Sequence, residues 1–155
     1  YIKDFGALAG RGKQYRLNLA DNRSYTLIDD SYSGQPEAMI MAIQNLDKMP
    51  TLGRKIALLG KMAELGETSQ ARHREIGRVL ANSSVDIIIG VCPEMQDMLH
   101  ELPADKQHFY FENKDGVTDF LLNKLLQKDD IVLIKGSHYS SKLFTVAAEL
   151  IKKGE

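Results

Sequence analysis

The sequence contains a single cysteine, Cys92, so no disulfide can form within the chain, and a cytoplasmic location is the default expectation. Charge of either sign is not in excess: 20 basic residues balance 21 acidic ones, leaving a net charge of −1. That balance gives no overall field to attract nucleic acid or an anionic membrane. The longest apolar run, residues 85–91, is interrupted by Asp86 and Gly90 and is too short for a membrane span. We therefore expect no nucleic-acid partner and no membrane span.

Two phosphate-binding motifs are also missing. The chain has no Gly-x-Gly-x-x-Gly fingerprint for a dinucleotide and no Gly-x-x-x-x-Gly-Lys-Ser/Thr loop for a triphosphate. The stretch Gly10-Arg11-Gly12-Lys13 is too short for such a loop and precedes a strand. These absences exclude binding of a triphosphate through a P-loop of this chain.

What the sequence does contain is an alternation of apolar strands and amphipathic helices, which predicts one α/β domain. Strands without polar alternation indicate a sheet covered on both faces, so we predict a Rossmann-like three-layer sandwich with a mostly parallel sheet and an N-terminal antiparallel hairpin. The expected hairpin strands are 16–19 and 25–28, the later strands are 55–59, 85–90, 108–111 and 131–134, and the helices are 36–48, 68–82, 93–102, 113–127 (with Asn113 as its N-cap) and 140–152.

The first dozen residues lack a strong period, and the chain begins with Tyr1 instead of methionine. We interpret residues 1–12 as a linker from a missing upstream domain and residues 13–155 as the folded domain.

The most informative stretch runs from Thr26 to Pro36, where a strand gives way to a polar loop and then a helix. It places Asp29 and Asp30 at the edge of the sheet where ligands bind in open α/β folds. Four loops are expected at this edge: 29–35, 60–66, 90–93 and 135–137. Turn formation and a favourable interaction with the helix dipole are equally good explanations of the two carboxylates.

Other residues near this edge have a structural and a functional interpretation. Tyr32 could pack on the sheet rim or line an adenine-ribose pocket. In Lys135-Gly136-Ser137 the basic group could bind an anion or pair with a carboxylate such as Asp29, while the hydroxyl of Ser137 could cap the last helix.

His73 and Cys92 carry reactive side chains, but the sequence around each favours a structural role. His73 borders the apolar face of its helix, and no second histidine or cysteine lies at metal-ligand spacing, so we expect a packed, hydrogen-bonded ring and no metal site. Cys92 follows a buried strand, so we expect it to lie at the edge of the core. We do not expect it to act as a nucleophile.

Four stretches occur in a fixed order along almost the whole chain, and His73 with Gly77 is a fifth, weaker point. They are Gly10-Arg11-Gly12, Asp29-Asp30-Ser31-Tyr32 with Pro36, Ile56-Ala57-Leu58-Leu59-Gly60 with Met62 and Glu64-Leu65-Gly66, and Val132-Leu133-Ile134-Lys135-Gly136-Ser137. In this order they resemble the C-terminal domain of the Mur ligases, and within that family the branch that adds D-alanyl-D-alanine to a UDP-N-acetylmuramoyl tripeptide.

The resemblance implies part of an ATP-dependent amide ligase of peptidoglycan synthesis, which serves cell-wall biogenesis, cell shape and cell division. In that family ATP and Mg²⁺ are bound mainly by a central domain and the UDP-sugar by an N-terminal one, both of which would be missing partners here. The C-terminal domain closes over ATP and places the amino substrate, so the isolated domain is expected to be inactive.

Residue by residue, the resemblance assigns a nucleotide-binding role to Arg11, Asp29, Asp30, Tyr32 and Ser33. It assigns substrate binding to Glu64, Lys135, Gly136 and Ser137, and no catalytic residue to this domain.

Two further hypotheses stay open. One is a Mur-like amide ligase acting on another carboxylate, and the other is a non-catalytic α/β domain that binds a nucleotide or a partner. The first rests on departures from the family's usual residues at Ser33, Gly34, Gln35, Lys61 and His138, which lie in or next to the expected loops. The second would use residues 29–35 to bind its ligand.

Overall fold

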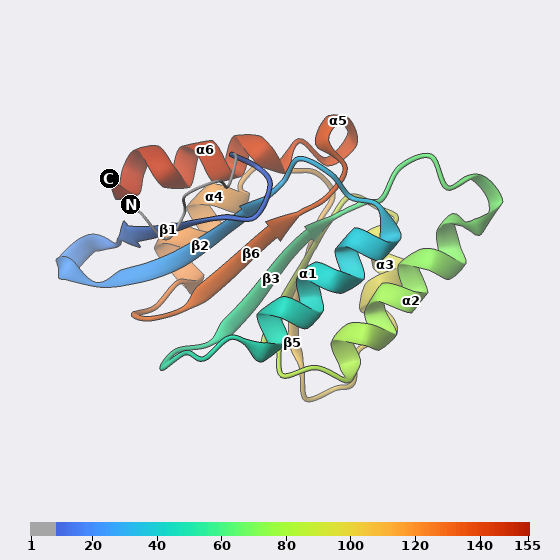
Figure 1. Ribbon diagram of the computed structural model, residues 1–155, viewed down its shortest axis with the longest axis horizontal. Coiled ribbons are helices and arrows are strands. Elements are labelled where there is room, and N and C mark those ends of the chain that lie inside the picture. Colours follow the sequence, from blue (N-terminus) through green and yellow to red (C-terminus); the bar gives the residue numbers. More distant parts are fainter. Residues whose placement is uncertain (1–8) are drawn as a thin grey trace.

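A computed structural model describes residues 9–155 and contains one mixed sheet with helices on both faces (Figure 1). Its strand order is β1-β2-β6-β3-β4-β5; β1 and β2 are antiparallel, and all the other pairings are parallel. The strands are β1 (Lys13–Asn18), β2 (Ser24–Asp30), β3 (Lys55–Gly60), β4 (Ile87–Val91), β5 (Gln107–Phe111) and β6 (Ile131–Lys135). The helices are α1 (Pro36–Lys48), α2 (Ser69–Ala81), α3 (Met95–Leu99), α4 (Val117–Phe120), α5 (His138–Ser141) and α6 (Leu143–Gly154). The predicted sandwich and its hairpin are confirmed.

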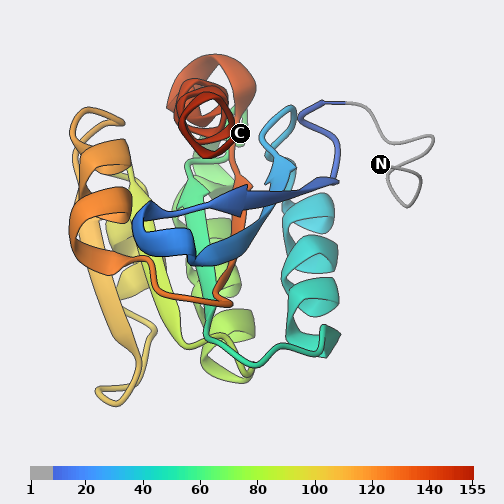
Figure 2. The same cartoon turned by 90° about the vertical axis from the view of Figure 1, so that its left-hand side faces the viewer.

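Two apolar layers hold the sheet between its helices. On one face, Met39 and Ile43 of α1 and Ile76 of α2 pack against Ala57 and other residues of the sheet. On the other face, Leu143 and Leu150 of α6 join Leu27 and Ile134 in a second cluster. Figure 2 faces the β1–β2 hairpin and shows α6 above it, with α1 to its right. A sheet with apolar contacts on both faces explains why strands such as β4 are buried at every residue.

The predicted bounds of α1 are confirmed, because Pro36 occupies the first turn and Gln35 before it is extended. Other boundaries shift by one to three residues; α3 in particular is limited to Met95–Leu99. Two short 3-10 turns lie at Ala20–Asn22 and Gly66–Thr68.

The prediction that Asn113 caps a helix extending to Gln127 is wrong. The side-chain oxygen of Asn113 accepts a hydrogen bond from Asp115 N–H at 2.8 Å, which forms a turn instead. The helix begins only after Gly116, whose φ of +82° is left-handed, and it ends in a π-helical turn at Leu121–Leu125.

The expected single helix over 140–152 is also wrong. Two helices occupy this region because Lys142 adopts a left-handed conformation with φ +54°, which separates α5 from α6. Ser141, just before the break, is buried, and its hydroxyl donates to Ser137 O at 2.7 Å. Ser141 lies against Gly60 and Gly136, so the short α5 packs on the ends of β3 and β6.

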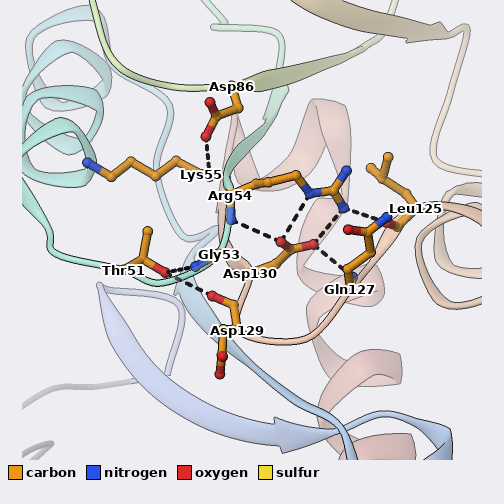
Figure 3. Close-up of polar contacts among 9 residues, drawn as sticks. All are labelled: Thr51, Gly53, Arg54, Lys55, Asp86, Leu125, Gln127, Asp129 and Asp130. Carbon is orange, nitrogen blue, oxygen red and sulfur yellow. Dashed lines mark hydrogen bonds and ion pairs between the residues drawn. The ribbon is translucent and has the colours of Figure 1, made fainter.

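The amino ends of β6 and β3 are joined by a buried network around Asp130 (Figure 3). Its carboxylate accepts hydrogen bonds from Arg54 N–H, from two guanidinium nitrogens of Arg54 and from Gln127 N–H, over 2.7–3.1 Å. The Arg54 guanidinium also donates to Leu125 O at 2.7 Å. This edge is thus fixed by charge-assisted hydrogen bonds, opposite the edge where the candidate site lies.

Candidate functional site

The carboxyl ends of the parallel strands β2, β6, β3 and β4 meet at one edge of the sheet, as predicted. Lys135 at the end of β6 is in register with Asp30 of β2 on one side and Leu59 of β3 on the other. Gly60 is in register with Val91 of β4. The four expected loops therefore leave the sheet side by side.

Glycines allow these loops to come into close contact. A Cβ on Gly34 would collide with the backbone nitrogen of Ser137, and one on Gly136 would lie 2.9 Å from Gly60 Cα. Any larger residue would push the loops after β2, β6 and β3 apart. The expected substrate-binding role of Gly136 remains a prediction; its role in packing is direct.

Asp29 and Asp30 point to opposite faces of the sheet because side chains alternate along a strand. The Asp29 carboxylate is buried and accepts hydrogen bonds from Ser31 Oγ at 2.5 Å and from Ser31 N–H at 3.2 Å. This is the turn-forming role that the sequence left open. Its expected nucleotide contact stays a prediction, and its side chain lines neither of the clefts described below.

Asp30 faces α1 and forms an ion pair with Lys135, with 2.9 Å between Oδ2 and Nζ. The lysine side chain is only 3% exposed, against 23% for the aspartate. The expected alternative that Lys135 pairs with a strand-end carboxylate is therefore observed, with Asp30 instead of Asp29 as the partner.

A first cleft of about 360 Å³, which we call the Arg11 cleft, brings together several of the predicted residues. The Arg11 guanidinium lies 4.0 Å from the centroid of the Tyr32 ring, an arrangement typical of a cation–π contact. Within residues 9–155 no carboxylate pairs with Arg11. The cleft is lined by Arg11, Asp30, Tyr32, Ser33, Ala38, Met41, Ala42, Asn45 and Lys135.

A second cleft of about 240 Å³, the Glu64 cleft, shares Tyr32 and Ser33 with the first. Glu64 is exposed and adopts a left-handed conformation with φ +61°. The His138 ring stacks on Phe144 at 4.4 Å and faces Tyr32 at 5.6 Å. The cleft is lined by Tyr32, Ser33, Gly34, Gln35, Ala63, Glu64, Ser137, His138 and Tyr139.

Ser137 lies at the first position before α5, but its hydroxyl makes no capping hydrogen bond, so that expectation is wrong. Its backbone makes the contacts instead: the N–H donates to Lys61 O at 2.9 Å, and the carbonyl accepts from Ser141 N–H at 3.0 Å. The hydroxyl is thus not used by a cap, and Ser137 is one of the residues that line the Glu64 cleft.

The two clefts divide the predicted residues differently from the sequence analysis. Lys135 was expected beside Glu64 and Ser137, but it lies in the Arg11 cleft with Asp30. Residues of α1, including Met41 and Asn45, were missed. Met41 and Asn45 are four residues apart next to the apolar stripe of α1, and this spacing could have indicated that both lie on the same side of the helix.

His73 and Cys92 have the structural settings expected of them. His73 is fully buried in α2 and hydrogen-bonded through both ring nitrogens. Cys92 is 7% exposed, and burial raises the pKa of its thiol, which disfavours a nucleophilic thiolate. Within residues 9–155 no cluster of three potential metal ligands comes together, and none of the described helices is long and apolar enough to cross a membrane.

Residues 1–8 of the expected linker lie outside the described part of the chain. Gly10 and Gly12 at its end hydrogen-bond to the domain: Gly12 N–H donates to Asp29 O and Tyr32 N–H donates to Gly10 O, both at 2.8 Å. These two bonds hold Arg11 against the end of β2.

Comparison with known families gives a match over most of the chain. The profile of the family described as Mur ligase, glutamate ligase domain, matches residues 15–138. Curated relatives include the UDP-N-acetylmuramoyl-tripeptide--D-alanyl-D-alanine ligase of Buchnera aphidicola subsp. Acyrthosiphon pisum, 37% identical over 83% of this chain and 27% of the relative. The Bacillus subtilis enzyme of the same name is 28% identical over 97% of this chain and 33% of the relative. The chain thus spans about a third or less of these relatives' length.

Solved structures with the same fold include MurF ligase from Thermotoga maritima in complex with ADP. That structure is 26% identical in sequence and superposes with a TM-score of 0.73. The match covers 95% of this chain and 31% of the Thermotoga chain. A MurF structure from Acinetobacter baumannii gives a TM-score of 0.76 at 24% identity, over 94% of this chain and 31% of its own, and supports the fold.

Proposed function

Because this chain belongs to the Mur ligase family, as its glutamate ligase domain, we propose that it is the C-terminal part of an ATP-dependent ligase that joins D-alanyl-D-alanine to a UDP-N-acetylmuramoyl tripeptide. Its relatives from Buchnera and Bacillus carry that name. The reaction would take place in the cytoplasm and supply peptidoglycan precursors. The N-terminal and central domains of the same polypeptide are its proposed partners, and the central one would hold most of the ATP and the Mg²⁺.

The observation that carries the nucleotide part of the proposal is the guanidinium of Arg11, which lies over the Tyr32 ring and has no carboxylate partner among residues 9–155. An arginine without a carboxylate partner in residues 9–155 is suited to bind a phosphate oxygen, and an exposed aromatic ring is suited to stack on a base. Ser33 adds a hydroxyl to the same cleft. The residues therefore fit a nucleotide, and the Thermotoga relative binds ADP.

Asp30 and Lys135 complete this cleft as a neutral pair. Since the Lys135 ammonium is buried and already paired, we propose that its main role is to hold the Asp30 carboxylate in place, not to bind the carboxylate of the amino substrate. Asp30 is the more exposed partner, so it can accept a hydrogen bond from a ribose hydroxyl or an incoming ammonium.

The Glu64 cleft is the proposed site of the amino substrate. Glu64 supplies an exposed carboxylate suited to an ammonium group, and Ser137 supplies a hydroxyl suited to a carboxylate. The two clefts share Tyr32 and Ser33, which would place nucleotide and amine next to the same loop.

The test uses the full-length polypeptide that contains this chain and measures ADP release that depends on D-alanyl-D-alanine. Arg11→Ala should raise the KM for ATP, and the loss of a charge-assisted hydrogen bond of about 1.5–3 kcal/mol predicts a roughly ten- to hundredfold lower kcat/KM. Arg16→Ala is the matched control, because Arg16 pairs with Asp129 at the far edge of the sheet. Equal losses in the two variants would contradict the proposed nucleotide cleft.

Replacing Asp30 and Lys135 together separates function from folding in the same assay. Asp30→Ala alone would leave the Lys135 ammonium, which is only 3% exposed, without its carboxylate, and we expect its melting temperature to fall. The double variant Asp30→Asn/Lys135→Met removes both charges and should keep the melting temperature closer to that of the parent while activity is lost. Parent-like activity in the double variant would show that the pair only supports the fold.

A further inference from the structure

His73 connects helix α2 to the loop that precedes it, residues 61–66. Its Nε2 lies 3.0 Å from the backbone nitrogen of Met62, and its Nδ1 lies 2.8 Å from Ser69 O. A backbone N–H can only donate and a carbonyl can only accept, so Nδ1 carries the proton and Nε2 presents its lone pair to Met62. The ring is fully buried, which fixes both contacts.

The hydrogen bonds of the loop continue from this point to the Glu64 cleft. The residue before Met62, Lys61, accepts a hydrogen bond from Ser137 N–H through its carbonyl at 2.9 Å. Ser137 and His138 line the cleft together with Ala63 and Glu64. One peptide unit, between Lys61 and Met62, is therefore held by α2 on one side and holds the β6–α5 loop on the other.

The Met62 side chain is also buried in the apolar layer and helps to anchor the loop, but the other polar contacts described for the loop do not fix the Lys61–Met62 peptide. The Lys61 ammonium pairs with Glu94 at 3.0 Å, but both side chains are about one-third exposed, and such a pair adds little rigidity. Thr68 N–H bonds to Leu65 O within the turn before α2 and does not reach the cleft. Glu64 itself is exposed and has no ion-pair partner in the described part of the chain.

We propose that His73 is a positioning residue of the Glu64 cleft: through its neutral ring it fixes the Lys61–Met62 peptide, and thereby the distance between Glu64 and Ser137. The inference rests on the proposed function for its substrate, but the effect of His73 on the loop can be measured without that substrate. His73 touches neither cleft, so its removal should change the binding of the amino substrate and leave the Arg11 cleft intact.

Two substitutions of His73 separate the loop contact from the contact within α2. His73→Gln can place a side-chain oxygen near the position of Nε2 and accept from Met62 N–H, whereas His73→Asn reaches only Ser69. In the full-length enzyme we expect His73→Asn to raise the KM for D-alanyl-D-alanine about tenfold or more, because misplacement by about 1 Å is costly, with the KM for ATP changed less than about twofold. His73→Gln should restore most of the loss.

Leu80→Ala is the matched control, since Leu80 is a fully buried residue of the same helix that lowers stability when truncated but lies away from the loop. It should lower the melting temperature without changing the ratio of the two KM values. The inference is overturned if Leu80→Ala shifts that ratio as His73→Asn does, or if His73→Gln is as impaired as His73→Asn.

Hydrogen exchange on the same proteins provides a readout that needs no substrate. His73→Asn should accelerate exchange of the amides at 62–64 and 137 by about tenfold or more, with the strands unaffected, and His73→Gln should not. If the parent enzyme shows no activity dependent on D-alanyl-D-alanine, the proposed function fails while this exchange pattern can still hold. If exchange at 62–64 is unchanged in His73→Asn, the positioning role fails whatever the substrate.

Discussion

Asp130 offers the sharpest test of how the sheet is held together. Its carboxylate is completely buried and accepts four hydrogen bonds, three of them from Arg54 and one from Gln127 N–H (Figure 3). Asp129, the preceding residue, pairs with Arg16 through side chains that are 25% and 54% exposed. The two neighbours thus carry the same chemical group in opposite environments.

Asp130→Asn keeps the shape of the side chain but replaces one acceptor oxygen with a donor. The Oδ2 atom that accepts from Arg54 Nη2 and Gln127 N–H, at 2.7 and 2.8 Å, would become an amide nitrogen facing two donors. Breaking a buried pair in this way costs about 3–5 kcal/mol, which for a domain of this size corresponds to a fall in Tm of roughly 6–20 °C. Asp129→Asn removes only a partly exposed pair and should cost less than about 1 kcal/mol, and asparagine also tolerates the left-handed backbone there.

Thermal and urea unfolding of both variants, followed by circular dichroism, measures this difference. Equal shifts for Asp129→Asn and Asp130→Asn would refute the assignment of Asp130 as the main polar support of this edge. A native-like Tm for Asp130→Asn would show that the amide can be satisfied by a rearrangement of Arg54.

Three further results are expected. Tyr25→Phe removes a fully buried hydroxyl that has no hydrogen-bond partner in the described part of the chain, so the free energy of unfolding near pH 7 should be unchanged or higher. Burial raises the pKa of Tyr25 to about 12, so the parent should lose stability as this tyrosine ionises in the unfolded state above about pH 10, and the variant should lose less. Urea titrations near pH 7 and above about pH 10 measure both effects. Gly136→Ala should lower the free energy of unfolding by about 1–3 kcal/mol in urea titrations, since the new methyl group would meet Gly60 Cα at 2.9 Å, and an unchanged midpoint would show that the loops can separate freely. The chain alone should bind ATP with Mg²⁺ weakly or not at all by isothermal titration, because it has no P-loop, and a sub-micromolar Kd would contradict this expectation.

The layers of this fold were predictable from the sequence because apolar periodicity dominates its packing. Strands such as β4 are buried at every residue, and α1 keeps its apolar stripe from Met39 to Leu46. The two helix errors arose where backbone conformation, not periodicity, decides the boundary. A left-handed Gly116 delays α4 and a left-handed Lys142 divides α5 from α6, although the apolar pattern runs on across each.

The candidate site was predictable as an edge of the sheet, but not as a set of contacts. Side-chain alternation along Tyr25, Leu27 and Asp29 already implied that Asp29 faces the apolar layer under α6 and Asp30 the other one. The pairing of Asp30 with Lys135 depended on the strand order, because β2 and β6 are over a hundred residues apart in sequence and are neighbours in the sheet. No local signal encodes such an adjacency.

The two edges of the sheet differ in how their charges are compensated, and this difference supports the anion site that we propose. At the amino edge Arg54 pairs with Asp130 and Arg16 with Asp129. At the carboxyl edge Asp30 and Lys135 neutralise each other, which leaves Arg11 with only the face of an aromatic ring among residues 9–155. A cation whose charge is not met by a carboxylate retains its attraction for a phosphate, whereas a paired arginine must first break its ion pair. The strand-end ion pair is thus consistent with the anion binding that we propose at Arg11, because the Asp30 carboxylate pairs with Lys135 and not with the guanidinium.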